Sequence, residues 1–391
     1  MSRCPPERAV GGLGSRDFVL LLIASVGTFS NYAPLLSVVP MWAAHGQAVA
    51  GGAGAATGVT MAGTVAAQLC MPWLQRRFRL STVLAAGALV LGVPTFGYGL
   101  SSALGWILAV SAVRGAGFGV VAVAGSALVA ELVPPSHRGR AVGWYGMAVG
   151  LPQVVLLPLG VWTAQHIGFG LVFAATGAAS VAACPLILAT RLLAGRHAVS
   201  VPRPAAGSVR GTGRLRPLAR PWLLVIVVSA AFGGITAFVP LMAGGSAIAP
   251  AALFGMSAAV IVGRWTAGVR GDRAAPGRLL LPSVAACALG MAGLAAAAFT
   301  GAVVLALPAA VVYGLGFGAL QNDTLVVMFG RADHGLASTV WNLAIDAGTG
   351  VGATAIGWGS GLLGLGGAFG VCAAAIAGLA PAALGIRLRR P

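Results

Sequence analysis

Lysine is absent from this chain of 391 residues, and acidic residues and cysteines are few, at seven and five. A phosphate-binding loop of the Walker type needs a lysine, so nucleotide binding of that kind is excluded. The cysteines are scattered through mostly apolar stretches, which predicts buried small side chains rather than a disulfide framework or a metal site. They are Cys4, Cys70, Cys184, Cys287 and Cys372. We expect neither a metal nor another cofactor.

Charge of either sign is also scarce. Charged residues make up 8% of the chain, about a third of the share in a soluble domain, so they cannot cover a globular surface. Hydrophobic residues make up 58%. They gather into about twelve runs of roughly 20 residues, the length that crosses about 30 Å of hydrocarbon. The predicted fold is therefore an all-α polytopic membrane protein with twelve transmembrane helices. The predicted spans are 17–42, 50–73, 80–99, 103–131, 139–164, 168–191, 221–243, 249–270, 278–300, 302–329, 336–361 and 364–386.

The arginines predict the orientation of these spans. All 24 basic side chains other than histidine are arginine. Apart from Arg114 and Arg264, they lie before the first span, after the even-numbered spans and at the C-terminus. Basic loops stay in the cytoplasm, which predicts a multi-pass protein of the cell membrane with both termini cytoplasmic. Because the arginines are dispersed over short loops, the formal net charge of +17 does not indicate a nucleic-acid partner.

An internal repeat divides the chain. "RGAGFG" at 114–119 returns as "YGLGFG" at 313–318, and "HRGRAVGWYGMAVG" at 137–150 returns in outline as "DHGLASTVWNLAID" at 333–346. The repeat predicts two pseudo-symmetric halves of six helices, which have the same orientation because six is even. The predicted parts are an N-terminal bundle at 1–191, a basic cytoplasmic linker at 192–220 and a C-terminal bundle at 221–391.

Two stretches carry a family resemblance. "GVRGDRAAPGR" at 268–278 is similar to the loop signature of the major facilitator superfamily, and "AVRGAGFG" is similar to its signature in the fourth helix, with Arg114 as the arginine. The loop signature matches at Gly268, Asp272, Arg273, Gly277 and Arg278. Its first-half equivalent, "PWLQRRFRL" at 72–80, departs from the pattern. The glycines of 139–164 fit the antiporter signature loosely, so the chain most resembles the drug:proton antiporter-like branch and its actinobacterial members.

Polar residues inside the apolar spans are the candidates for function. "GLGFGALQNDTLVVMFGR" at 314–331 places Gln321, Asn322 and Asp323 together, and Asn342 and Asp346 share one face of the span 336–361. A charge at the bilayer centre costs about 2.5–3.5 kcal/mol. Asp346 lies roughly 16 Å deep by helix rise, near the midplane. We expect Asp346 or Asp323 to carry a coupling proton; the alternative is a static structural role for each.

Further residues are predicted to line the pathway or to gate it. Arg114 is expected to bind an anionic group or to influence a carboxylate; the alternative is a tether to Asn31, which would itself line the pathway. The resemblance implies that the first, fourth, seventh and tenth spans line the cavity. Residues expected to gate it are Glu131, Arg264, Gly268, Asp272 and Arg273; their alternative role is that of solvated or structural groups.

These features predict a secondary active transporter that works by alternating access, as a monomer. The apolar lining and few fixed charges favour proton-coupled export of a small amphipathic organic compound. The alternative is a proton symporter or facilitator that imports a small metabolite; a channel is a third possibility. An enzyme is not expected, because neither a His-Glu-x-x-His nor a Gly-x-Ser-x-Gly motif occurs.

Overall fold

The computed structural model describes residues 13–134, 137–194, 216–271, 276–332 and 334–387, and every regular element within these ranges is a helix. The long helices are α1 (Arg16–His45), α2 (Ala50–Arg77), α3 (Leu80–Gly97), α4 (Leu104–Leu132), α5 (Arg138–His166), α6 (Phe169–Ala194), α7 (Ala219–Met242), α8 (Ile248–Gly271), α9 (Leu280–Thr300), α10 (Ala306–Phe329) and α11 (His334–Ala377). Short elements are α12 (Ala380–Arg387) and the 3-10 turns η1 (Tyr98–Leu100), η4 (Arg216–Leu218) and η5 (Val303–Leu305).

Ten helical segments in the described part of the chain are long and apolar enough to cross a membrane. α2 is not among them, because glycine, alanine and threonine fill its first half. α11 and α12 together form one apolar stretch, Gly335–Ile386. Within it Gly364 leaves the helical conformation (φ 69°, ψ 166°), a left-handed φ that glycine adopts without strain. The break falls at the predicted start of the last span.

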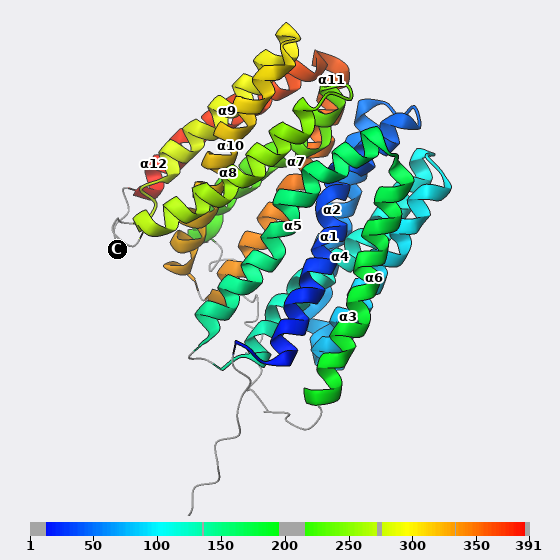
Figure 1. Ribbon diagram of the computed structural model, residues 1–391. Helices are drawn as coiled ribbons and strands as arrows, with labels where there is room; N and C mark the ends of the chain where they lie inside the picture. Colours follow the sequence, from blue (N-terminus) through cyan, green and yellow to red (C-terminus); the bar gives the residue numbers. More distant parts are fainter. Residues whose placement is uncertain (1–12, 135–136, 195–215, 272–275, 333, 388–391) are drawn as a thin grey trace, which may run out of the picture.

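The helices run side by side as a bundle (Figure 1), with α1–α6 (blue to green) on one side and α8–α10 and α12 on the other. In the first group α1 packs on α5 and α6, and α2 packs on α4. In the second, α8 and α9 pack on α10, and α7 packs on α11. The two groups meet where α2 contacts α11, α5 contacts α8 and α1 contacts α7.

The repeated glycine motif makes equivalent contacts in both groups. A Cβ atom at Gly115 or Gly119 of α4 would strike a backbone carbonyl of α2, and one at Gly314 or Gly318 of α10 would strike a backbone carbonyl of α8. The helix backbones therefore touch, which small residues allow in a membrane protein. The middle glycines repeat the pattern on the opposite side, where Gly117 meets α3 and Gly316 meets α9.

A second backbone contact joins the two groups at one end of the bundle. A Cβ atom at Gly54 of α2 would meet the Ala353 carbonyl of α11, and one at Gly357 of α11 would meet the Ala50 carbonyl of α2. Nearby, the Ser37 hydroxyl of α1 donates a 2.6 Å hydrogen bond to the Thr236 carbonyl of α7. We call this contact of the Ala50 end of α2 with α11 the α2–α11 seam.

The boundaries and the cysteines differ in part from the prediction. α6 extends to Ala194 and α7 begins at Ala219, so both ends of the predicted linker 192–220 are helical; residues 195–215 lie outside the described residues. Among the described cysteines, Cys184 and Cys287 are buried as expected. The expected burial is wrong for Cys70, which is exposed, and Cys372 is only half-buried; Cys4 lies outside the described ranges.

Candidate functional site

The centre of the site is a hydrogen bond between α2 and α11. The side-chain amide of Gln68 donates through Nε2 to Oδ2 of Asp346 at 2.7 Å, across 278 positions of sequence. Asp346 is half-buried. The Oε1 atom of Gln68 is buried and accepts no hydrogen bond. Asp346 therefore meets the other group of helices through a neutral partner, which leaves it free to exist with or without its proton.

Tyr32 of α1 packs against α4 beside Arg114. Its ring stacks on Phe118 of α4 with the centroids 3.6 Å apart and the planes within 2° of parallel. Both the Asp346 carboxylate and the Arg114 guanidinium lie within electrostatic range of the Tyr32 phenol. The carboxylate lies on α11 and the guanidinium on α4, and no ion pair joins these two described residues.

Arg114 of α4 is buried, with 2% of its surface exposed. Its Nε donates to Asn31 Oδ1 at 3.1 Å, and one terminal nitrogen donates to the carbonyls of Asn31 and Tyr32 at 3.5 and 3.4 Å. The Tyr98 hydroxyl lies beside the guanidinium. Pro34 removes a backbone hydrogen bond and loosens α1 at this level. The tether to Asn31 predicted as an alternative is therefore present.

Asn31 is held in place by α3 as well as by Arg114. The Asn31 amide donates to the Thr95 hydroxyl at 2.9 Å, and Thr95 in turn donates to the Leu91 carbonyl of its own helix. Asn31 is fully buried. Its oxygen therefore faces the arginine and its nitrogen faces α3, so Asn31 orients the guanidinium rather than lining an open pathway.

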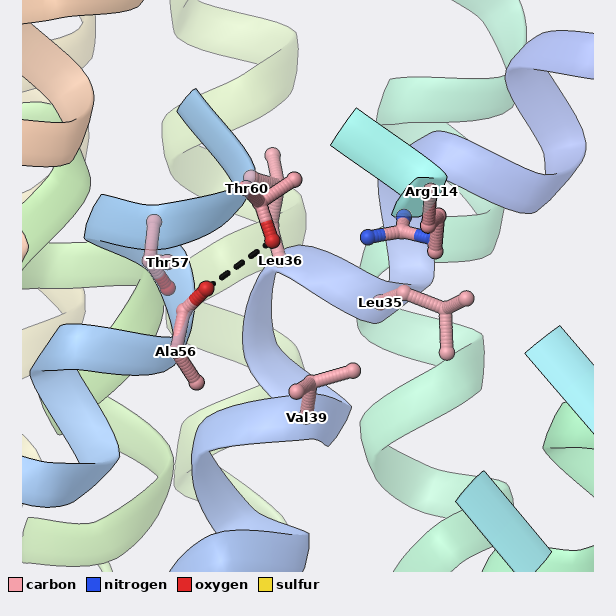
Figure 2. Close-up of a pocket in the computed structure, with 7 residues that line it drawn as sticks. All are labelled: Leu35, Leu36, Val39, Ala56, Thr57, Thr60 and Arg114. Atoms are coloured by element: carbon pink, nitrogen blue, oxygen red, sulfur yellow. Dashed lines mark hydrogen bonds between the residues drawn. The ribbon is translucent and has the colours of Figure 1, made fainter. Parts of the chain in front are cut away.

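A small cavity lies against Arg114 (Figure 2). Its volume is about 10 Å³, and the side chains around it come from α1, α2 and α4. In Figure 2 a terminal nitrogen of Arg114 points toward the side on which Leu36 and Thr60 lie. The Thr60 hydroxyl donates to the Ala56 carbonyl. The lining residues are Leu35, Leu36, Val39, Ala56, Thr57, Thr60 and Arg114.

The polar run in α10 is mostly directed into its own group of helices. The Asp323 carboxylate accepts hydrogen bonds from the backbone N–H groups of Gly277 (2.8 Å) and Leu279 (2.9 Å), just before α9 begins. Gln321 is buried and Asn322 is half-buried, near Gly268 of α8. The carboxylate satisfies backbone donors at the start of a helix, which matches the structural alternative for Asp323.

The second polar residue of α11 is turned away from Asp346. Asn342 is exposed, and its amide donates to the Ser338 carbonyl one turn earlier. No described hydrogen bond joins Asn342 to Asp346, which lies one turn further along. Of the polar residues predicted on this face, only Asp346 reaches the other group of helices.

Comparison with known proteins identifies the family. A model of the Major Facilitator Superfamily matches residues 18–325. This chain belongs to that superfamily. No curated protein matches it in sequence.

Solved structures of Major Facilitator Superfamily transporters share its fold. They include the nucleoside transporter NupG (13% identity, TM-score 0.74, covering 96% of this chain and 100% of that one). A bacterial homologue of the human lysosomal transporter Spinster gives 16% identity and a TM-score of 0.74, covering 97% of each chain. The xylose transporter XylE from E. coli gives 15% and 0.73, covering 97% and 98%. The chain is thus a multi-pass membrane protein with a transporter fold rather than an enzyme.

The predicted gating residues of this superfamily member lie in different surroundings. Glu131 is exposed at the end of α4. Arg264 of α8 is exposed as a residue, and its guanidinium carbon lies 5.9 Å from the ring centroid of Trp341 on α11, within cation–π range. Gly268 is half-buried on the next turn of α8. Asp272 and Arg273 lie outside the described residues.

Three residues of this site carry no direct signal in the sequence. Gln68 lies in a mixed polar and apolar run, and its role depends on Asp346, which is remote in sequence. Thr57 and Thr60 were also missed, because threonines spaced three apart in an alanine-rich helix are ordinary packing residues. The departure of α2 from high hydropathy was the available signal, since a membrane helix that is less apolar than its neighbours must face something other than lipid.

Proposed function

We propose that the protein is a proton-coupled secondary transporter that works by alternating access and that Asp346 takes up and releases the proton. The Gln68–Asp346 hydrogen bond carries this proposal, because it places an ionisable group in the contact between helices that must separate. An ionisable group within the membrane is costly unless it has a function. Its only described side-chain partner is neutral, so nothing fixes the carboxylate in its ionised form.

The proposed architecture is twelve membrane helices in two six-helix halves, with α11 and α12 containing the last two. The equivalent contacts of the repeated glycines support it, as does the break at Gly364. The arginine pattern supports an orientation in the cell membrane with both termini in the cytoplasm. In that orientation the α2–α11 seam lies on the extracellular side, so the transport cycle requires the seam to open. The proposed functional unit is a monomer.

Within this scheme, Arg114 and Asp346 belong to the substrate and proton pathway, together with the less central Gln321, Asn322 and Asn342. Asn31 serves the pathway by orienting Arg114. Asp323 has a structural role at the start of α9. Arg264 and Gly268 are proposed to gate the pathway with Asp272 and Arg273, because Arg264 lies against Trp341 between α8 and α11. Glu131 has the same proposed role at the end of α4.

The first candidate for the direction of transport is export of a small amphipathic organic compound in exchange for protons. The apolar surroundings of Arg114 and the scarcity of fixed charges support it. Exchange requires that proton and substrate do not bind together. Lowering the pH in the physiological range should then weaken substrate binding to the purified protein, and expression in a sensitive host should raise tolerance to the compound.

The second candidate is proton symport of a small metabolite, and the position of Arg114 favours it. An anion bound at Arg114 and a negative charge on Asp346 would repel each other across Tyr32, whereas protonation of Asp346 removes that repulsion. Proton and anion would then bind cooperatively, as symport requires. Substrate binding that strengthens as the pH falls, together with uptake into cells, would select this candidate over the first.

A solute-counterflow measurement in proteoliposomes across a panel of compounds tests the shared proposal. Counterflow of at least one compound without any gradient, together with gradient-driven accumulation that a protonophore abolishes, is expected. A protein that gives counterflow with no response to a proton gradient would be a facilitator, and the proton role of Asp346 would be rejected.

A further inference from the structure

Arg114 is a buried cation whose partners are all neutral. Its described partners are the Asn31 side chain, the carbonyls of Asn31 and Tyr32, and the neighbouring Tyr98 hydroxyl. No carboxylate in the described residues lies within ion-pair distance of it. A buried charge without an opposite charge is strongly unfavourable, so an apolar interior keeps such a group only where something else compensates it.

The acidic residues of the first six helices cannot provide this compensation. Glu131 lies 17 residues along α4 from Arg114, about 26 Å at the rise of an α-helix. Asp17 lies 14 residues along α1 from Asn31, about 21 Å. Asp346 comes from α11 and interacts with Gln68. The only other acidic residue of this part of the sequence is Glu7, outside the described residues.

The cavity beside Arg114 provides the rest of a binding site. Leu35, Leu36 and Val39 form an apolar wall, and Thr57 and Thr60 add two hydroxyls on the α2 side. Thr57 is buried and its hydroxyl makes no described hydrogen bond, so it is available as a donor. The Arg114 guanidinium and the Thr57 hydroxyl thus line the same cavity. A guanidinium is a typical receptor for a carboxylate, and the leucines and valine suit an apolar tail.

We propose that the cavity at Arg114 is the site of an organic carboxylate and that the transported compound is a small amphipathic monocarboxylate. This rests on the proposed function, whose substrate class it names. The carboxylate accepts hydrogen bonds from Arg114 and Thr57, and its apolar part lies along Leu36 and Val39. The volume of about 10 Å³ holds about one water molecule, so the whole compound fits only after α1 and α2 move apart. Binding therefore stabilises the wider form.

Thermal unfolding of the purified full-length protein in detergent tests this with hexanoate, which carries the carboxylate, and hexanamide, its neutral isostere. Hexanoate is expected to raise the unfolding temperature by at least about 2 °C at saturation, because a ligand that binds only the folded state stabilises it. Hexanamide is expected to have no such effect. An equal shift with both compounds, or none with hexanoate, overturns the proposal.

Substitutions at the cavity test whether the hexanoate-induced shift in unfolding temperature arises from binding at Arg114. Arg114→Gln should abolish the hexanoate shift, and Arg114→Lys should weaken hexanoate binding roughly tenfold, since the forked guanidinium is lost but the charge is kept. Arg220→Gln, which removes an exposed arginine at the start of α7, should leave the shift unchanged. Thr57→Val is nearly isosteric and should weaken hexanoate binding about fivefold through loss of one hydrogen bond; it keeps the test decisive if Arg114→Gln does not fold.

A salt control separates the carboxylate site from an inorganic anion site, and the design of the measurement separates it from the proton proposal. Sodium chloride at the same concentration should give no shift; a chloride effect equal to that of hexanoate would mean an inorganic anion site and overturn the proposal. The measurement needs no gradient and no transport. If proton coupling persists in Asp346→Asn, the proton proposal is rejected and the carboxylate site is unaffected. If the hexanoate shift persists in Arg114→Gln, the carboxylate site is rejected and the proton proposal is unaffected.

Discussion

Gln68 and Asp346 lie 278 positions apart in sequence, and the amide of the first donates a 2.7 Å hydrogen bond to the carboxylate of the second. The bond joins α2 to α11 and therefore links the two groups of helices. Any motion that separates α2 from α11 at this level breaks it. The protonation state of Asp346 and the relative position of the two helices are thus coupled through a single hydrogen bond.

Replacing Asp346 with asparagine removes the ionisable group and keeps the side-chain shape. Proton-driven transport by reconstituted protein should fall at least about tenfold, while counterflow without a gradient continues, since the loss is one of coupling rather than binding. Asp17→Asn at the start of α1 is the matched control and should retain the proton response. Undiminished coupling in Asp346→Asn would remove this residue from the mechanism.

Replacing Gln68 with leucine removes the donor to Asp346. A hydrogen bond to an ionised carboxylate favours the ionised form, so its loss favours the protonated form. The pH midpoint of transport should therefore move upward, by about one pH unit for a bond of about 1.5 kcal/mol. The pH profile of uptake is the measurement. A lower activity with an unmoved midpoint would mean that Gln68 has only a packing role.

Asp323 should contribute to stability rather than to transport chemistry. Asp323→Ala leaves the N–H groups of Gly277 and Leu279 without this acceptor, which should cost about 2–6 kcal/mol at about 1–3 kcal/mol per unsatisfied group. Thermal unfolding in detergent is the check. Asp323→Asn keeps one acceptor oxygen and should lose less stability; equal stability of all three proteins would contradict the role at α9.

The repeated glycines allow a matched comparison. Gly115→Ala places a methyl group against the backbone carbonyl of Thr60 and should destabilise the protein by about 1–3 kcal/mol, the usual cost of overpacking. Gly143→Ala in α5 has open space around it and should be neutral or stabilising by up to about 1 kcal/mol, because alanine is the better helix former. The order of their unfolding temperatures decides the point.

The orientation can be tested by labelling in intact cells, in a background without native cysteines. Val49 before α2 and Phe78 after it are both exposed. A membrane-impermeant maleimide should label Val49→Cys from outside, whereas Phe78→Cys should react only after the membrane is permeabilised. The opposite pattern would invert the proposed topology.

The sequence predicted the apolar helices well, because a lipid environment requires long apolar runs and internally satisfied backbones. It also identified "GAGFG" and "GLGFG" as copies of one motif, although not which backbones they touch. Partners remote in sequence escaped it: Gln68 for Asp346, Thr95 for Asn31, and the N–H groups of Gly277 and Leu279 for Asp323. Such pairs depend on how helices rotate against one another, which the periodicity of one segment does not determine.

The glycine contacts have a mechanical consequence. α2 and α4 touch through their main chains at Gly115 and Gly119, and α8 and α10 touch in the same way at Gly314 and Gly318. Because no side chain lies between the backbones at these glycines, we expect each pair of helices to move as one rigid body. Arg114 lies one residue before Gly115, so a displacement of α2 is passed directly to it. A movement that opens the α2–α11 seam therefore also displaces the guanidinium.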